Sequence, residues 1–404
     1  MRTFTGAGRR RRLVTTMAGA AVVILAGSTV SAPTASATQH RRQDSQLIDI
    51  LRADLRSYLA AEGADEHVSA ASLTVTFDPA GSGGRRPINL AAGTTRFGGG
   101  RPVTADARWQ IASNTKAFTS VLLLKLEAQG VLSVDDEIGT WLPQYPAWRR
   151  ITIRQLLNMT SGIPDFTELP AFTSAYFADP KRDFTADQLV SYAYGLPLGH
   201  GYGYSNTNYI IAEQIIERAT HDSYADQLTT RILKPLRLRD TCYGPVCPAR
   251  TAARMPAGYY APAPGQATSM PVLALTAMQA AGGIVASLPD LARWERALYH
   301  GELLPPRQQR ELESLVSVET GLPISTTTPS DPHGYGLGVG QVTSPVVGKA
   351  WVYEGETSGF RSVIMYVPSS GVLVSLALNS GGVAEDHLPQ LLLKVYQDLT
   401  AAKY

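Results

Sequence analysis

The fold is decided by the stretch Trp109-Gln110-Ile111-Ala112-Ser113-Asn114-Thr115-Lys116-Ala117-Phe118. An apolar, strand-like lead-in runs here into a segment whose apolar residues form a stripe broad enough for a buried helix, and Gly130 provides a C-terminal stop for that helix. Ser113 therefore stands where the helix begins. Lys116 follows three residues later and lies on the same helical face.

A serine and a lysine at this spacing can form a nucleophile and its base. A serine hydroxyl is a poor nucleophile near neutral pH, and a buried lysine can activate it because desolvation lowers the lysine pKa. The partial positive charge of a helix N-terminus also favours a developing oxyanion. The alternative is an N-cap serine beside a solvated lysine. Lys116 is the only lysine with a serine three residues before it, and the leucine run behind it favours the buried pair.

The first 37 residues have the pattern of a secretory signal. Residues 2 and 9–12 are arginines and residues 17–26 are mostly apolar. Ala35-Ser36-Ala37 then matches a cleavage site, so we expect the mature chain to begin at Thr38 and to be secreted, by either the Sec or the twin-arginine route. The apolar run is too short to span a bilayer, and we therefore expect no stable membrane anchor.

Charge and cysteine content narrow the classes of function. Removal of residues 1–37 takes away five arginines and no acid, so the formal net charge falls from +2 to −3. The remaining chain has no nucleic-acid footprint. Cys242 and Cys247 favour a small disulfide loop in an exported protein, the alternative being two separate thiols. We expect no redox or metal centre at this pair, because no histidine or further cysteine lies near it. The serine chemistry described above needs no metal and no cofactor.

Periodicity predicts helices along the mature chain and strands toward both of its ends. Helices are predicted over residues 47–63, 151–159, 186–194, 208–219, 289–299 and 388–399, and strands over residues 73–77, 88–92, 335–339, 350–353, 362–367 and 372–378. Residues 131–270 are expected to be mostly helical with long loops. The aromatic segment 165–180 is expected to be a loop that either walls a pocket or covers the core.

The predicted elements give an α/β (α+β) fold in which helices flank one antiparallel sheet built from both ends of the chain. We expect one domain of residues 38–404. Its sheet lobe covers about residues 45–112 plus 271–404, and an inserted all-helical lobe covers about residues 113–270. A site would lie in the cleft between the two lobes.

Tyr204-Ser205-Asn206 is a second candidate for chemistry. It lies in a glycine- and tyrosine-rich loop just before a predicted helix and is the only Tyr-x-Asn in the chain. A tyrosine near a lysine can be shifted toward phenolate and act as a general base, and an asparagine can bind an amide by both donating and accepting. The alternative is a tyrosine packed in a loop and an asparagine in a turn.

Taken together, these segments resemble class C β-lactamases, D-Ala-D-Ala carboxypeptidases and related esterases and D-amino-acid peptidases. The resemblance covers most of the mature chain. It includes, in this order, Ile111-Ala112-Ser113-Asn114-Thr115-Lys116, Leu156-Leu157-Asn158-Met159-Thr160-Ser161-Gly162-Ile163, Tyr204-Ser205-Asn206-Thr207-Asn208-Tyr209, Ala281-Gly282-Gly283-Ile284 and Gly334-Tyr335-Gly336-Leu337-Gly338. It implies a β-lactamase/transpeptidase-like fold, in which a helical domain is inserted into an α/β domain with an antiparallel sheet.

The resemblance also implies roles for individual residues. Ser113 would be the acylated nucleophile, and Lys116 and Tyr204 would share the general-base and general-acid work. Asn206 would hold the amide on the acyl side of the substrate. The place of the family's third element is taken by Tyr353-Glu354-Gly355, and the oxyanion hole would be the backbone N–H groups of Ser113 and Glu356.

This third element departs from the family pattern, which is usually His-Thr-Gly or Lys-Thr-Gly and helps to bind a substrate carboxylate. Glu354 would repel a carboxylate if its side chain faced the cleft. Gly340 also stands where carboxypeptidases tend to have an arginine. The alternatives are that Glu354 points away from the cleft, or that the correspondence is shifted by one residue, which on a strand reverses the side-chain direction.

The prediction is therefore an exported serine hydrolase that works through an acyl-enzyme. Its reaction would be acyl transfer of the D-alanyl-D-alanine carboxypeptidase or β-lactamase type, on peptide, amide or lactam carbonyls. An esterase or D-amino-acid amidase with weakened carboxylate recognition is the first alternative, and a non-catalytic binding protein on the same fold is the second. The expected partner is a small-molecule or peptide substrate, cell-wall peptide included, and no nucleic acid.

Overall fold

The computed structural model describes residues 35–77, 86–273 and 275–402. The predicted signal falls mainly on residues 1–34, which lie outside the described residues. The described residues from Asp44 onward belong to one compact unit. No helix in the described ranges is both long and apolar enough to cross a membrane.

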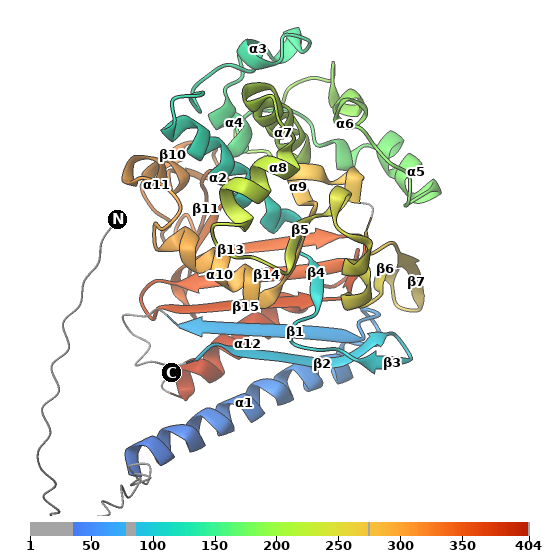
Figure 1. Ribbon diagram of the computed structural model, residues 1–404, viewed down its shortest axis with the longest axis vertical. Helices are drawn as coiled ribbons and strands as arrows, with labels where there is room; N and C mark the ends of the chain where they lie inside the picture. Colours follow the sequence, from blue (N-terminus) through green and yellow to red (C-terminus); the bar gives the residue numbers. More distant parts are fainter. Residues whose placement is uncertain (1–34, 78–85, 274, 403–404) are drawn as a thin grey trace, which may run out of the picture. The chain divides into compact units, whose positions relative to one another are not determined.

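The centre of the molecule is a ten-stranded antiparallel sheet (Figure 1). Its strands, in spatial order, are β10 (Pro323–Ile324), β9 (Leu315–Ser317), β11 (His333–Tyr335), β12 (Gly340–Ser344), β13 (Gly348–Thr357), β14 (Phe360–Val367), β15 (Val372–Leu378), β1 (Ala70–Phe77), β2 (Ile88–Arg96) and β3 (Gly99–Pro102). β1 pairs with β15 in register Leu73 to Leu376. The prediction of an antiparallel sheet built from both ends of the chain is thus confirmed, although two further three-stranded sheets accompany it.

Two terminal helices cover one face of this sheet. Leu51 and Leu55 of α1 (Ala35–Ala61) are fully buried in one apolar cluster with Val395 and Leu399 of α12 (Leu388–Ala401). Each buried leucine contributes about 1.5–3 kcal/mol by removing its side chain from water. The leucine spacing that predicted these helices is therefore the spacing that attaches them to the sheet.

The other face packs against α10 (Leu288–Tyr299) and the helical lobe. All seven residues of β15 are buried, because helices lie on both faces of this strand, and this explains an apolar run that only Ser375 interrupts. The Phe118 ring stacks on the Trp294 ring of α10, with ring centroids 3.7 Å apart. This stack joins the helix behind Ser113 to the sheet.

The helical lobe lies beyond β13 in Figure 1. Its members are α2 (Thr115–Ala128), α3 (Ile138–Trp141), α4 (Ile153–Leu157), α5 (Pro170–Ala178), α6 (Ala186–Ala193), α7 (Asn206–Thr220), α8 (Tyr224–Leu228) and, returning from later in the chain, α9 (Gln279–Gly282). α2 is the central helix, and most of its side chains are buried. It ends just before Gly130, whose φ of +71° suits the predicted stop.

Parts of the secondary structure differ from the prediction. Residues 241–270 form three strands and two 3-10 segments rather than α-helices. β5 (Thr241–Tyr243) pairs with β8 (Ile284–Ser287), which also pairs with β4 (Arg108–Gln110). β6 (Gly258–Ala263) and β7 (Gln266–Met270) pair with each other and with β16 (Ser380–Gly381). The segment expected to be a loop at 165–180 contains α5. These short elements have too few residues to display a period.

The predicted strand at 335–339 stops at Tyr335. Gly338 has a φ of +78°, and a Cβ atom there would be 2.6 Å from Ser120 Oγ and 3.0 Å from the Lys116 carbonyl oxygen. The chain therefore turns against α2 at this glycine before β12 begins. Cys242 and Cys247 are joined by a disulfide, with Cα atoms 5.4 Å apart.

Candidate active site

Ser113 lies in a tight turn between β4 and α2. The turn is a 3-10 segment, Ala112–Asn114, and Ala112 has a φ of +48°, a left-handed conformation that alanine rarely adopts. Asn114 Nδ2 donates to the Ile111 carbonyl at 3.1 Å and to Ser362 Oγ at 2.9 Å. These buried contacts hold the strained turn to β14, and the strain is of the kind found at functional sites.

The predicted serine, lysine and tyrosine come together in three dimensions. Lys116 Nζ lies 3.0 Å from Ser113 Oγ, and Tyr204 OH lies 2.7 Å from the same oxygen. Tyr204 comes from the loop just before α7, 91 residues away in sequence. One serine hydroxyl thus has two candidate proton-transfer partners within hydrogen-bond reach.

Lys116 is fully buried, and desolvation lowers its pKa to about 7, although the charge of Asp165 opposes this shift. Besides Ser113, its Nζ contacts Asn206 Oδ1 at 2.7 Å and the Ala281 carbonyl at 2.8 Å. A neutral amine has two N–H donors and one lone pair. If the two donors bind Asn206 and Ala281, the lone pair is left facing Ser113, which is the geometry of a general base.

The predicted shift of Tyr204 toward phenolate is wrong. Desolvation raises the pKa of Tyr204, and this outweighs the hydrogen bonds from Ser113 and Tyr353 that lower it. The ring is 39% exposed at the cleft, but the phenol stays protonated near neutral pH. Tyr204 is therefore placed to donate or relay a proton, while Lys116 is the group whose pKa suits a base.

Asn206, the first residue of α7, has both ends of its amide engaged. Its Oδ1 accepts from Lys116, and its Nδ2 donates to Asp165 Oδ2 at 2.9 Å and to Thr167 Oγ1 at 3.2 Å. Asn206 lies on the cavity wall, but the expected contact with a substrate amide would require one of its N–H donors to leave Asp165 or Thr167. Asp165 and Thr167 are site residues that sequence reasoning missed. Their only signal was the polar start of the aromatic segment 165–180, which indicated at most a pocket wall.

The third element lies on β13, where alternate side chains point to opposite sides. Tyr353 is buried and hydrogen-bonds Tyr335 OH at 2.5 Å. Glu354 belongs to the lining of the cavity that also holds Ser113, on the side of β13 opposite to Gly355, and this favours the orientation toward the cleft. Gly355 packs directly on the Ser113 turn, which fits the unshifted correspondence. Glu356 also lines the cavity, and its carboxylate accepts from the Gly382 N–H.

The cavity that holds these groups has a volume of about 480 Å³. Its described lining includes five acids, namely Asp165, Glu168, Glu354, Glu356 and Asp386, and one cation, Arg361. Desolvation and the neighbouring acids raise the pKa values of Glu354 and Glu356. Because five acids and one cation line the cavity, it has an excess of negative charge, which disfavours anionic ligands.

Arg361 offsets only part of this charge, because its guanidinium pairs with Glu66 outside the cavity lining as well as with Asp386. The side chain is 1% exposed, donates to Glu66 Oε2 at 2.5 Å and to the Ser380 carbonyl at 3.1 Å, and also binds Asp386. Only a small part of its donor capacity remains for a ligand.

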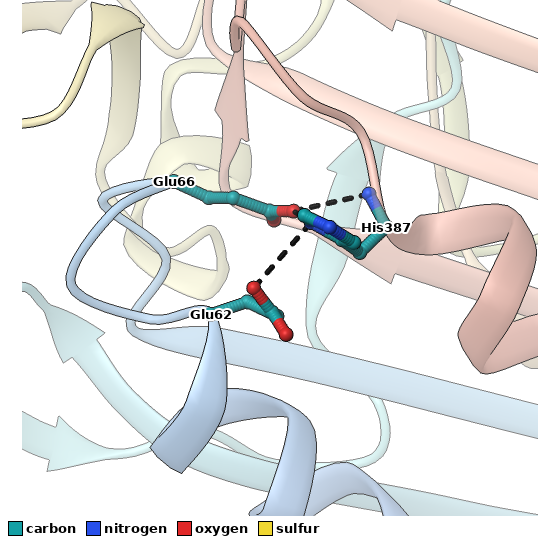
Figure 2. Close-up of side chains that lie close together, drawn as sticks. All are labelled: Glu62, Glu66 and His387. Atoms are coloured by element: carbon teal, nitrogen blue, oxygen red, sulfur yellow. Dashed lines mark hydrogen bonds and ion pairs between the residues drawn. The ribbon is translucent and has the colours of Figure 1, made fainter.

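Glu66 also belongs to a cluster that could be mistaken for a metal site (Figure 2). Ligand atoms of Glu62, Glu66 and His387 lie within 4.8 Å of one another. Both Glu66 oxygens are already occupied, Oε2 by Tyr58 and Arg361 and Oε1 by the His387 backbone and ring. With an arginine as direct neighbour, this cluster is better explained as an ion-pair hub that ties the end of α1 to the start of α12.

Several known proteins are similar to this chain in sequence or in fold. Residues 58–397 match the model of a family described as Beta-lactamase. Penicillin-binding protein 4* from Bacillus subtilis is 27% identical over 69% of this chain and 62% of its own length, and protein flp from Staphylococcus aureus is 37% identical over 34% of this chain and 28% of its own length. The chain thus matches less than two thirds of the length of these curated relatives.

Solved structures extend the similarity over nearly the whole fold. A D-stereospecific amidohydrolase from Streptomyces sp. is 27% identical with a TM-score of 0.71, covering 85% of this chain and 97% of that one. A D-amino acid amidase from Ochrobactrum anthropi SV3 has a TM-score of 0.74 at 24% identity, covering 89% of this chain and 100% of that one, and supports the fold alone. With the family match over residues 58–397, these findings place the chain in the beta-lactamase family of hydrolases, which also includes penicillin-binding proteins and D-amino acid amidases.

Proposed function

We propose that this protein is a serine hydrolase that acts through a covalent acyl-enzyme. The observation that carries the proposal is the position of Ser113 Oγ, 3.0 Å from the amine of a fully buried lysine and 2.7 Å from a protonated tyrosine. A base and a proton donor within hydrogen-bond reach are sufficient to activate a serine. Lys116 is a base near neutral pH because its pKa is lowered.

The reaction has two acyl transfers. Neutral Lys116 takes the Ser113 proton as Oγ bonds to the substrate carbonyl carbon, and the backbone N–H groups of Ser113 and Glu356 receive the oxyanion. Collapse of the tetrahedral intermediate breaks the bond to the leaving amine or alcohol, which takes a proton through Tyr204 and Lys116. A water molecule then attacks the acyl carbon and passes a proton to the same pair. Collapse of this second intermediate breaks the bond to Ser113 Oγ, which takes that proton back, and the carboxylic acid product leaves.

The acidic cavity favours substrates without a carboxylate beside the scissile bond. We propose amides or esters, with D-amino-acid amides as the first class to test, because Glu354 and Glu356 line the cavity and Arg361 is engaged elsewhere. The similarity to a D-stereospecific amidohydrolase supports this choice. We further propose that the protein is secreted after loss of residues 1–37, as the sequence predicts.

A D-Ala-D-Ala carboxypeptidase of the cell wall is the second candidate. It is favoured by the similarity to penicillin-binding protein 4*. It requires recognition of a terminal carboxylate, which the five acids of the cavity wall oppose.

The test uses mature protein and its Ser113→Ala variant. Each is mixed with a penicillin, with short esters and with D- and L-amino-acid amides, while intact-protein mass and product release are followed. We expect Ser113-dependent hydrolysis of esters or D-amino-acid amides and little penicillin adduct. A stable penicillin adduct on the wild type alone would favour the carboxypeptidase. No Ser113-dependent reaction with any of these substrates would contradict a hydrolase and favour the non-catalytic alternative.

A further inference from the structure

A buried acid outside the cavity is connected to the catalytic lysine. Glu213 lies on α7, two turns after Asn206, and is 7% exposed. One carboxyl oxygen accepts from the Ala280 N–H at 2.8 Å, and the other is 2.7 Å from Tyr243 OH. The next residue after Ala280 is Ala281, whose carbonyl contacts Lys116 Nζ at 2.8 Å.

Neither Ala280 nor Ala281 has a polar side chain that could fix the position of this segment. It belongs to the four-residue helix α9, whose first residue, Gln279, has a strained φ of +39°. The Ala281 N–H donates to the Met278 carbonyl at 2.9 Å within the turn. Two side chains hold the Ala280 peptide from outside: Glu213 accepts from its N–H, and Thr119 Oγ1 donates to its carbonyl at 2.9 Å. Removing the Glu213 contact would leave a buried N–H without a partner and release one side of this clamp.

We propose that Glu213 is a positioning residue for the Ser113–Lys116 pair, acting through the Ala280–Ala281 peptide. This inference rests on the proposed function. The Ala281 carbonyl accepts a hydrogen bond from one N–H of neutral Lys116, and Asn206 Oδ1 accepts from the other. A correctly placed Ala281 carbonyl therefore directs the lysine lone pair at Ser113. Glu213 holds that carbonyl in place without touching any reacting atom.

The chemistry of Glu213 agrees with a structural acceptor. Desolvation raises its pKa to about 8, so the carboxyl is largely neutral at neutral pH. A neutral carboxyl accepts a hydrogen bond from the Ala280 N–H with one oxygen, and its other oxygen forms a hydrogen bond with the Tyr243 hydroxyl. A glutamine can make both contacts, whereas a leucine of similar size can make neither. Burying an acid here has a free-energy cost that an apolar side chain would avoid, which favours a role beyond packing.

The test measures the reactivity of Ser113 directly and needs no natural substrate. Ser113 is labelled with a fluorophosphonate, in which Oγ bonds to phosphorus, fluoride leaves and the serine proton passes to Lys116. The second-order labelling rate is measured against pH for wild type, Glu213→Gln and Glu213→Leu. The control is Glu295→Leu, which replaces a fully buried acid on α10. Circular dichroism and melting temperature establish that each variant is folded.

We expect Glu213→Gln to label within about two-fold of wild type and Glu213→Leu to be slower by about ten-fold or more, because small displacements of a catalytic group have large rate effects. The Glu213→Leu profile should also move to lower pH, since loss of the Ala281 acceptor destabilises charged Lys116 and lowers its pKa. The titratable groups around both residues are unchanged in these variants. Lys116 is surrounded by Tyr204, Tyr209 and Asp165, and Glu213 is surrounded by Tyr224, Tyr243 and Glu217.

Each outcome decides the question. Equal rates and profiles for Glu213→Leu and wild type, or equal losses in the Gln and Leu variants, would overturn the positioning role. A similar loss in Glu295→Leu would show a general effect of altering a buried acid and would overturn it as well. A wild type that does not label at Ser113 would instead contradict the proposed function itself, and with it any catalytic role for Glu213.

Discussion

The backbone of Gly355 on β13 lies directly against the amide of Ser113. A Cβ atom at position 355 would be 2.9 Å from Ser113 N and 2.5 Å from the Ile111 carbonyl oxygen. Such distances are shorter than real Cβ contacts, and the neighbouring atoms belong to the backbone, so neither side can move aside cheaply. Gly355 therefore sets how closely the strand that carries Glu354 and Glu356 approaches the nucleophile.

We expect Gly355→Ala to separate β13 from the Ser113 turn. The proposed oxyanion hole needs Ser113 N–H and Glu356 N–H at one point, and its disruption should lower kcat about 100-fold or more. The measurement is the steady-state hydrolysis of a substrate found by the Ser113-dependent screen, with melting temperature alongside. Gly199→Ala is the matched control, because a Cβ atom there meets only ordinary contacts, the nearest at 3.7 Å. Full activity in folded Gly355→Ala would contradict this role for the close approach.

The pH dependence should report the titration of Lys116. Its pKa of about 7 means that the neutral base is lost as the pH falls through that value, so kcat/KM should decline on the acid side of pH 7. The Asp165 charge raises this pKa. Asp165→Asn removes the charge but keeps an oxygen for Asn206, and we expect the acid limb to move to lower pH. The check is a kcat/KM profile for wild type and Asp165→Asn, with Asp179→Asn as the control.

An acid limb that stays in place in Asp165→Asn, or moves to higher pH, would contradict the assignment of that limb to Lys116. An equal shift in Asp179→Asn would mean that the change reflects net charge rather than the local contact.

Replacing Lys116 should raise stability while it abolishes activity. The pKa is about 7 in the folded protein and about 10.5 in an unfolded chain. Below pH 7 both states bind the proton, and the folded state bears the full cost of the buried charge, at most about 5 kcal/mol for this difference. The cost disappears as the pH rises through the unfolded value. We therefore expect Lys116→Met to gain stability most at low pH and progressively less toward pH 10.

Urea unfolding of Lys116→Met and wild type at several pH values checks this prediction. Lys125→Met is the control for loss of a lysine in the same helix. A gain that is independent of pH would attribute the effect to packing of the methionine and not to the buried amine.

The sequence was sufficient for the long strands of the sheet and for the residues that meet at Ser113, but not for the short elements. β15 and α12 were predictable because long apolar runs and four-residue spacing have one structural solution each. Ser113 and Lys116 could be paired because both lie at the start of one helix, whereas Tyr204 was joined to them through the resemblance of its motif to a known family. Elements of two to six residues, such as β5 and β16, are stabilised by partners far away in sequence, and no local period indicates them.

Two electrostatic properties of the site also could not be predicted from the sequence. The protonated state of Tyr204 follows from desolvation, which depends on everything packed around it. The contacts of Asn206 with Asp165 and Thr167 join residues about 40 positions apart. Glu213 gave no signal at all, since an acid in a helix is ordinarily solvent-exposed and only the fold buries this one.

The cavity acids should determine which substrates are accepted. Glu354 faces the cavity, and its pKa is raised by desolvation and by Asp386 and Glu356, so an anion placed there would meet further repulsion. We expect wild type to prefer an N-acyl-D-Ala-D-Ala amide over the matching free acid. Glu354→Thr should shift the ratio of kcat/KM values toward the acid by about ten-fold, an effect of about 1.4 kcal/mol, because one like charge is removed.

The two substrates differ only in their terminal charge, so the ratio cancels changes in folding or in active fraction. Glu385→Thr is the control, since that side chain is 86% exposed and does not belong to the cavity lining. The shift should also shrink at high salt, where exposed charges are screened. An unchanged ratio in Glu354→Thr would mean that Glu354 does not select against carboxylates, and a cell-wall carboxypeptidase would then become the stronger candidate.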